Sequence, residues 1–248
     1  MARDTRLLMG MPISLDLVDC DSTELFDDVF GYFAEVEARF SLYRPDSEIS
    51  TINLGTLAPA AFSAEMREVL ALAEQTRVQT NGYFDIRRPD GALDPSGIVK
   101  GWAIRNAAER IRQAGLTDFL VEAGGDIQTG GKNREGQDWR VGIRNPFNES
   151  EIIKAVSPRG RGIATSGSYV RGGHIYNPHE FAEPIETIVS LTVIGPDILE
   201  ADRFATAAFA MGTAGIGFIE QQDDFEGYVI DARGIATQTS GFGAYVIT

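Results

Sequence analysis

Cysteine and histidine are both scarce in this sequence. Among 248 residues there is one cysteine, Cys20, and there are two histidines, His174 and His179. A single cysteine excludes a disulfide within the chain and a metal site built from several thiolates. Two histidines argue against a zinc site with three histidine ligands, or with two histidines and a carboxylate.

Positive charge is in short supply as well. The chain carries 22 lysines and arginines against 36 aspartates and glutamates, which gives a net charge of -14. Nucleic-acid binding needs clustered basic residues, so this balance argues against nucleic acid as a partner. An anionic cofactor would need a local cationic pocket or a bound metal ion.

Long apolar runs and the common nucleotide motifs are missing too. No run is long enough to span a membrane, and the first residues, broken by Gly10 and Pro12, lack the apolar core of a signal peptide. There is no Walker A loop, no Rossmann glycine fingerprint after a strand and no nucleophile elbow. Ordinary P-loop, dehydrogenase and hydrolase interpretations therefore lose support.

The residues that are present predict a mixed α/β chain with helices and strands interspersed. Apolar spacing predicts helices at 23–40, 63–79, 99–114, 198–211 and 214–222, and strands at 8–18, 118–123, 139–144, 186–194 and 226–231. Residues 41–50, 84–97 and 160–178 are expected to be loops, and 235–247 strand or loop. Because no regular βαβ order appears, we expect residues 1–248 to form a single domain of mixed sheets and packed helices, in two intimately joined sub-lobes.

Asp202 and Thr206 are the first candidate site. Their spacing of four residues puts both on one face of the predicted helix. A carboxylate and a hydroxyl are hard oxygen donors suited to Mg²⁺ or Ca²⁺. The alternative is purely structural, since an aspartate in a first helical turn favours the helix dipole and a helical threonine often bonds its own backbone. Spacing alone favours the structural alternative.

Residues 93–102 form a second candidate, at the start of a helix. Free N–H groups at a helix start bind anions, and Lys100 would add positive charge. The simpler interpretation is that Asp94 or Ser96 caps the helix. Two glycine-rich segments, 121–127 and 163–178, could approach a ligand closely or cradle a phosphate. His174 in the second segment could act as a general base, although taken alone it is a loop histidine.

The order and spacing of these segments resemble the ApbE family, the FAD:protein FMN transferases. The resemblance runs from Met9 to about Gly212. The similar blocks are residues 9–11 (Met-Gly-Met), 40–53, 82–85 (Gly-Tyr-Phe-Asp), 93–101, 123–127 (Ala-Gly-Gly-Asp-Ile), 164–167, 174–178 and 201–206. Joint agreement of these blocks raises the weight of motifs that are weak alone, and it implies an ApbE-like fold.

The resemblance implies a role for each block. FAD would be a substrate, its FMN part passing to a threonine of a target protein. A Mg²⁺ ion would be held by Asp202, Thr206 and the carbonyl of Gly97. Asp202 and His174 would be the catalytic residues, with His174 as the base. The residues implied to line the FAD pocket are Met9, Tyr43, Tyr83, Phe84, Asp85, Asp94, Lys100 and Tyr176.

The chain also departs from the family pattern. Ile86-Arg87-Arg88 follows Asp85 where the family has Pro-Thr and a longer segment, and this leaves out part of the usual pocket wall. Met11, Pro95-Ser96 and Asn177 replace the usual threonine, Leu-Gly and aspartate. Many members are exported lipoproteins, but Cys20 lies inside the expected fold and is no lipobox cysteine. We therefore expect a cytoplasmic location for the chain as given, with an exported form whose leader was removed left open.

Three other functions remain open from the sequence. The same site with water in place of threonine would make a Mg²⁺-dependent FAD pyrophosphatase that yields AMP and FMN. The short segment after Asp85 is also compatible with an FAD-binding protein without catalysis. The plainest alternative is a relic of the fold that binds no flavin.

Overall fold

A computed structural model describes residues 3–20, 22–167, 175–180 and 184–247. Its α-helices are α1 (Thr23–Phe40), α2 (Glu48–Asn53), α3 (Ala64–Gln79), α4 (Ser96–Gln113), α6 (Ile198–Ala210) and α7 (Gly215–Glu220). Its strands are β1 (Arg3–Leu8), β2 (Met11–Leu17), β3 (Phe119–Ala123), β4 (Asp126–Gly130), β5 (Val141–Asn145), β6 (Asn148–Val156), β7 (Gly162–Gly167), β8 (Ile188–Gly195), β9 (Glu226–Asp231) and β10 (Ala236–Gln238). Within the described residues, no helix is both long and apolar enough to cross a membrane.

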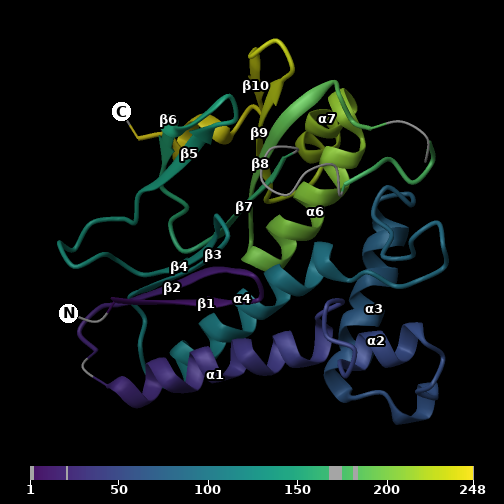
Figure 1. Ribbon diagram of the computed structural model, residues 1–248. Helices are drawn as coiled ribbons and strands as arrows, with labels where there is room; N and C mark the ends of the chain where they lie inside the picture. The colour runs from purple at the N-terminus through teal and green to yellow at the C-terminus, as the bar shows by residue number, and fades with distance from the viewer. Residues whose placement is uncertain (1–2, 21, 168–174, 181–183, 248) are drawn as a thin grey trace.

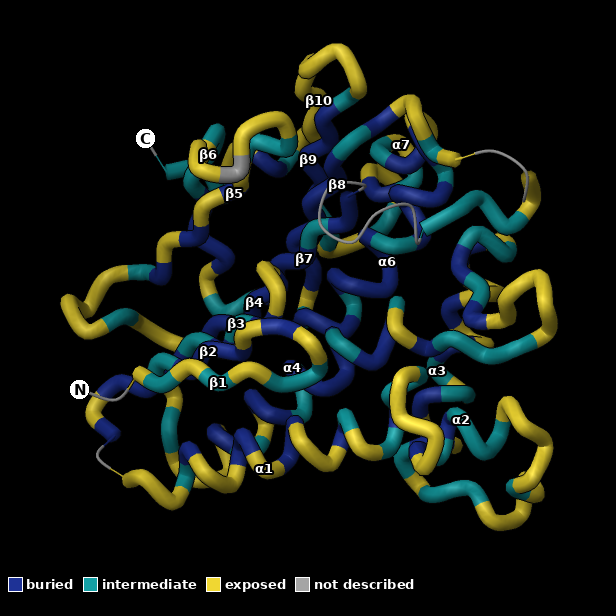
Figure 2. The backbone as a smooth tube through the Cα atoms, viewed as in Figure 1, coloured by how far each residue is buried: buried dark blue, intermediate teal, exposed yellow. Residues whose placement is uncertain are grey.

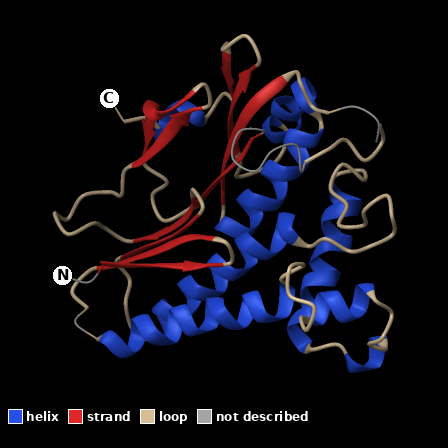
Figure 3. Ribbon diagram, in the orientation of Figure 1, coloured by secondary structure: helices blue, strands red, loops and turns tan. Residues whose placement is uncertain are grey.

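One antiparallel sheet organises the molecule. Its strand order is β1-β2-β3-β4-β7-β8-β9-β10, and β5 and β6 form a separate hairpin. Figure 1 shows α1, α4 and α6 on one side of this sheet and the β5–β6 hairpin on the other. The same arrangement of helices and strands appears in Figure 3. The prediction of a mixed α/β chain is confirmed.

Alternation along the central strands separates two apolar cores. On β7, Ile163 joins one buried cluster and Ala164 the other, and on β8 the neighbours Ile194 and Val193 divide in the same way. Successive strand residues point to opposite faces, so the middle of the sheet is buried on both sides. The larger cluster lies under the helices and the smaller under the β5–β6 hairpin, and Figure 2 shows buried backbone through the centre.

The long helices form where apolar spacing and capping agree. Ser22 caps α1 by accepting a hydrogen bond from the Leu25 N–H, and Arg39 lies in the last turn, where a cation favours the helix dipole. The predicted helix 23–40 is confirmed. The helix predicted from residue 99 begins three residues earlier, at Ser96, because Pro95 supplies the turn before it.

Several predicted elements were wrong in type or in extent. The strand expected at 8–18 is confirmed over residues 11–17 as β2, but its start is wrong, because Met9 and Gly10 adopt positive φ values of 53° and 72° and form a two-residue turn after β1. The loop expected at 41–50 contains the start of α2, which Ser47 caps. The first part of the glycine-rich segment expected to be irregular is β7, a central strand. Strands β4 and β6 had no counterpart in the prediction.

Small residues in β7 have a packing cause. A Cβ on Gly162 would lie 2.1 Å from the backbone nitrogen of Ile198, so α6 begins directly against this strand. A sequence of Gly, Ala, Thr and Ser resembles a loop, yet here it is what lets a helix approach a central strand. This contact fixes the start of α6, on which two of the predicted site residues lie.

Candidate active site

The site begins where α4 and α6 cross at close range. Gly97 and Gly101 are one helical turn apart on α4, and Thr206 and Asp202 are one turn apart on α6. A Cβ on Gly101 would lie 2.8 Å from the Asp202 Cβ, and a Cβ on Gly97 would lie 3.3 Å from the Thr206 Cγ2. Only glycine at position 101 allows this approach. The crossing therefore brings the two predicted metal-binding segments together, and we call Gly97, Lys100, Gly101, Asp202 and Thr206 the pocket floor.

A hydrogen bond between the helices bears directly on the Gly97 carbonyl. The Gly101 N–H donates to Asp202 Oδ2 over 2.8 Å. In a regular helix this N–H would donate to the carbonyl four residues earlier, which is that of Gly97. Asp202 therefore competes with the Gly97 carbonyl for one donor. The competition leaves the carbonyl oxygen with acceptor capacity for a cation.

Thr206 adds a third oxygen. Its side chain is half-buried on the pocket side of α6, and its hydroxyl makes no hydrogen bond to any described residue. This differs from the common structural role of a helical threonine, in which the hydroxyl bonds its own backbone. The hydroxyl is thus available to a ligand in the pocket.

Lys100 is the cation of the pocket floor. Its Nζ lies 2.6 Å from Oδ2 of Asp126 and 3.8 Å from Oδ1 of Asp202. Asp126 is buried, and its other oxygen accepts a hydrogen bond from the Thr165 N–H over 3.1 Å. The Gly-Gly-Asp turn predicted near 124–126 thus contributes its aspartate as the partner that holds Lys100.

Burial makes the Asp202 carboxylate costly to ionise. Asp202 is 4% exposed, and desolvation raises its pKa to about 7, with the nearby Asp126 carboxylate adding to the rise. Lys100 and the Gly101 N–H act in the opposite direction by favouring the charged form. A buried carboxylate with incomplete charge compensation is a site that a divalent cation would stabilise.

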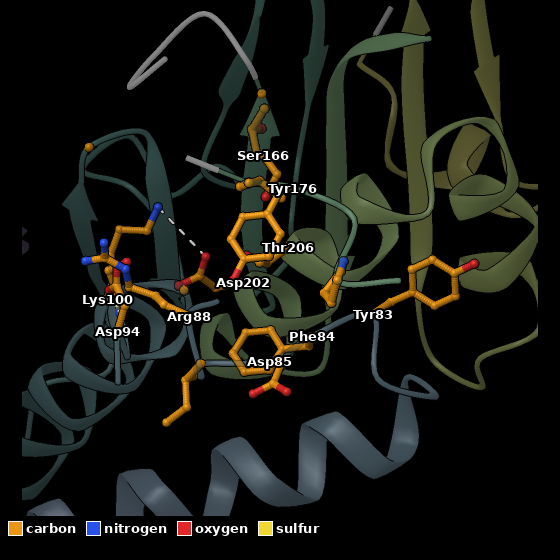
Figure 4. A pocket seen from close by; sticks show the side chains of 18 residues that line it. Tyr83, Phe84, Asp85, Arg88, Asp94, Lys100, Ser166, Tyr176, Asp202 and Thr206 are labelled. Atoms are coloured by element: carbon orange, nitrogen blue, oxygen red, sulfur yellow. Dashed lines mark hydrogen bonds and ion pairs between the residues drawn. The ribbon is translucent and has the colours of Figure 1, made fainter. Parts of the chain in front are cut away.

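A pocket opens above the floor and collects most of the predicted residues. It is lined by Tyr83, Phe84, Asp85, Ile86, Arg88, Asp94, Ser96, Gly97, Lys100, Gly124, Thr165, Ser166, Gly167, Ile175, Tyr176, Pro178, Asp202 and Thr206. Figure 4 shows the Phe84 and Tyr176 rings around the centre of this pocket, with Asp202 and Thr206 close to them. Aromatic faces, oxygen donors and cations therefore meet in one cavity.

The aromatic wall is tied to the floor through buried polar groups. Thr80 accepts a hydrogen bond from the Phe84 N–H over 3.1 Å. On α6, the Arg203 guanidinium donates to Thr76 Oγ1 over 3.0 Å and to Glu200 Oε1 over 3.0 Å. Arg203 is 4% exposed. Its hydrogen bonds link α6 to the end of α3, after which the chain continues to Tyr83 and Phe84.

The segment after Asp85 folds as a tight hairpin. The Asp94 N–H donates to the Ile86 carbonyl over 2.7 Å, and the Arg88 N–H donates to the Ala92 carbonyl over 2.8 Å. The Asn53 side chain holds one arm, because it exchanges hydrogen bonds of 2.8 and 2.9 Å with the Leu93 backbone. We call residues 86–94 the rim hairpin. It carries Arg88 and Asp94 at the pocket edge.

The structure brings together nine of the residues singled out in the sequence. These are Tyr83, Phe84, Asp85, Asp94, Gly97, Lys100, Tyr176, Asp202 and Thr206. Met9 and Tyr43 are not among the lining residues: Met9 lies in the β1–β2 turn against the core, and Tyr43 is 97% exposed. Their contact with a ligand stays a prediction. His174 lies outside the described residues, and its role as base stays a prediction too.

Sequence reasoning missed Arg88 as a pocket residue. It lines the cavity although the sequence marked this stretch only as a departure from the family pattern. One signal in the sequence could have indicated Arg88. An anionic ligand needs cations around it, and cations are scarce in a chain of net charge -14. Thr165, Ser166 and Gly167, from the segment suggested as a phosphate cradle, also line the pocket.

The donor set fits a hard cation better than zinc. Among the described residues there is no group of three histidine, cysteine, aspartate or glutamate side chains close enough to hold a metal. The floor instead offers one carboxylate, one hydroxyl and one backbone carbonyl, all oxygen. Mg²⁺ accepts few protein ligands, because it keeps waters and takes phosphate oxygens from its substrate.

Comparison with known proteins finds several relatives that are FAD:protein FMN transferases. The FAD:protein FMN transferase of Salmonella typhimurium is 38% identical over 135 residues, which cover 50% of this chain and 38% of that protein. The Escherichia coli K12 FAD:protein FMN transferase is 34% identical over 63% of this chain and 47% of its own length. This chain thus matches less than half the length of these two relatives. The Vibrio cholerae protein of the same name is 27% identical over 77% of this chain and 75% of its own.

Solved structures share the fold. The flavin transferase ApbE from Vibrio cholerae superposes with a TM-score of 0.87 at 24% identity and covers 98% of both chains. The apbe protein from Thermotoga maritima gives a TM-score of 0.86 at 18% identity, over 100% of this chain and 99% of that one. The ApbE family model matches residues 9–90 and 86–229. This chain therefore belongs to the ApbE family.

Proposed function

We propose that this chain is a metal-dependent FAD:protein FMN transferase. In the reaction, the hydroxyl oxygen of a threonine on a target protein attacks the FAD phosphorus on the riboflavin side. The bond from that phosphorus to the bridging oxygen breaks, and AMP leaves with the bridging oxygen. The threonine proton passes to a base, and FMN remains attached through a phosphodiester. The names of the relatives support FAD as substrate and a protein as acceptor.

The observation that carries the proposal is the pocket floor. Two helices cross so closely that the Gly97 carbonyl, the Asp202 carboxylate and the Thr206 hydroxyl face one cavity beside Lys100. We infer that these three oxygens hold Mg²⁺. When bound there, Mg²⁺ would neutralise the pyrophosphate and stabilise charge on the departing AMP. Lys100 adds a fixed positive charge to the same end of the pocket.

The wall residues suit the flat part of the substrate. Phe84 is 3% exposed and Tyr176 half-buried, so their rings are held in place before a ligand arrives. Tyr83 packs edge-on against His179, with ring centroids 4.6 Å apart, and His179 Nε2 lies 3.0 Å from the Asn81 carbonyl. Aromatic faces of this kind bind the isoalloxazine ring by stacking. In this proposal His174 takes the threonine proton.

The test uses purified protein with FAD, MgCl₂ and an acceptor domain that carries the threonine. Transfer predicts flavin fluorescence that stays with the acceptor after denaturation, a mass increase of one FMN group, and AMP released in equal amount. Asp202→Ala should abolish all three. Full transfer by Asp202→Ala would rule out the assigned metal site.

Omitting the acceptor separates transfer from hydrolysis. A transferase releases little AMP without an acceptor, because its nucleophile is missing. Rapid release of AMP and free FMN in that control would identify a pyrophosphatase instead. Binding of FAD with neither product would identify a protein that binds FAD without catalysis.

A further inference from the structure

Two consecutive arginines of the rim hairpin face different cavities. Arg87 forms a bridge with Leu93, so this part of the hairpin is extended and neighbouring side chains point to opposite sides. Arg88 lines the pocket that holds Lys100, Asp202 and Thr206. Arg87 instead lines a separate groove against α3. The chain thus offers two equal charges, adjacent in sequence, of which one is turned to the substrate pocket.

Among the described residues, the two cations that line the pocket differ in how firmly they are held. Lys100 is 16% exposed and lies 2.6 Å from the buried Asp126. Arg88 pairs with Asp90 on its own hairpin over 3.1 Å, and these side chains are 48% and 56% exposed. An exposed ion pair contributes little to stability. Arg88 can therefore exchange Asp90 for an anion in the pocket at small cost.

The charged groups that act on Tyr176 are mostly carboxylates, and Arg88 is the cation among them. Burial raises the pKa of Tyr176, and the carboxylates of Asp85, Asp94 and Asp90 add to the rise. Arg88 acts against them. Its guanidinium is therefore within electrostatic reach of the Tyr176 ring, in a region otherwise dominated by carboxylates. An anionic ligand next to Tyr176 would need this charge.

We propose that Arg88 binds a phosphate of the dinucleotide substrate and thereby selects phosphorylated flavins over riboflavin. The inference rests on the proposed function, since FAD is taken as the ligand. A pyrophosphate carries two negative charges, and a guanidinium offers paired N–H donors that match phosphate oxygens. Arg88 and the proposed cation site at the pocket floor would together neutralise these two charges. The rim hairpin thus contributes one cation to the pocket.

The test compares Arg88→Ala with Arg87→Ala, a matched control of the same charge change. Each variant and the wild type are titrated with FAD, FMN and riboflavin in MgCl₂, by quenching of flavin fluorescence. Arg88→Ala should weaken FAD and FMN binding about tenfold, as expected for one partly exposed charged hydrogen-bond partner, and leave riboflavin binding unchanged. Arg87→Ala should bind all three as the wild type does. Arg88→Lys should recover part of the loss.

Each other outcome would overturn the inference. Unchanged FAD binding by Arg88→Ala would show that Arg88 does not contact the ligand. Equal losses for riboflavin and FAD would mean that Arg88 contacts the ring and not a phosphate, and equal losses in both variants would mean a general effect of rim charge. Transfer by the wild type, measured in parallel, judges the proposed function separately. A wild type that binds no FAD would overturn both.

Discussion

The pocket floor and the rim hairpin are built in opposite ways. The floor is set by backbone proximity: a glycine at 101 that allows no side chain, and a buried hydrogen bond of 2.8 Å to Asp202. The rim is set by exposed contacts, among them the Arg88–Asp90 ion pair and the clasp of Asn53 on the Leu93 backbone. Buried contacts carry more free energy than exposed ones. Changes in the floor should therefore alter both stability and chemistry by large amounts, whereas changes in the rim should act mainly on ligand affinity.

The largest effect is expected for Gly101→Ala. The added methyl group would lie 2.9 Å from the Ile198 carbonyl oxygen as well as against Asp202, so the helices must move apart. We expect a loss of about 3 kcal/mol in the free energy of unfolding, typical of overpacking, and loss of transfer. Gly31→Ala in α1 is the control, because a Cβ there meets nothing within 4 Å. It should gain about 0.5–1 kcal/mol from helix propensity. Urea unfolding measures both, and equal effects would contradict a glycine-dependent crossing.

Asp202→Asn should separate stability from function. Folding raises the pKa of Asp202 from 3.8 to about 7, so the folded state keeps a proton that the unfolded state loses near pH 4. Stability therefore falls as pH rises through this window, and the penalty is complete above pH 7. The neutral amide of the variant does not carry this penalty. In EDTA the variant should be more stable than wild type by on the order of 2 kcal/mol at pH 8, with a smaller gain at pH 5.

The same variant should lose metal-dependent transfer. Urea unfolding at the two pH values and the acceptor assay give both readouts. A variant that is less stable than wild type at pH 8 would show that burial of the ionised Asp202 carboxylate does not destabilise the folded state.

Arg203→Met tests the link between floor and wall. Methionine keeps much of the apolar stem but removes the donors to Thr76 and Glu200, and Glu200 would be left without its partner. We expect about 2 kcal/mol of destabilisation, below the value for a fully buried pair because Glu200 is 26% exposed. The KM for FAD should rise more than kcat falls. The segment that carries Tyr83 and Phe84 loses its anchor to α6, whereas the oxygen ligands of the pocket floor stay in place. Arg105→Met, at a pair in which both side chains are at least 30% exposed, should change neither.

Asn53→Ala should have the smallest effect on stability. It removes both hydrogen bonds to Leu93, but these are exposed, so the loss should be about 0.5–1 kcal/mol. The affinity for FAD should still fall severalfold, because the arm that carries Asp94 is released. Thermal unfolding and FAD titration are the measurements. An unchanged affinity would show that the rim is held in place without this clasp.

The sequence predicted the elements that have local causes and missed those that depend on distant contacts. The helix at 23–40 was found because its apolar spacing and its cap are local features. The β1–β2 hairpin was missed because Met9 is not a typical turn residue, although its positive φ makes it one. Strand β7 was missed because its small residues are explained only by α6, more than thirty positions away.

The site shows the same limit. Asp202 and Thr206 could be paired from their spacing, but the contact between Gly101 and Asp202 joins residues 101 positions apart, and no local pattern indicates it. Arg88 was overlooked because its place in the pocket depends on how the rim hairpin folds. Tyr43 was assigned to the pocket by resemblance; it is almost fully exposed and does not line the cavity, and its contact with a ligand stays a prediction.

The most direct test of the pocket floor is a crystal structure with FAD and Mn²⁺ in place of Mg²⁺, in which anomalous scattering locates the ion. We predict one strong peak bonded to the Asp202 carboxylate, the Thr206 hydroxyl and the Gly97 carbonyl, at about 2.0–2.3 Å, with the FAD pyrophosphate as a further ligand. A metal bound elsewhere, or FAD bound outside this pocket, would contradict the account.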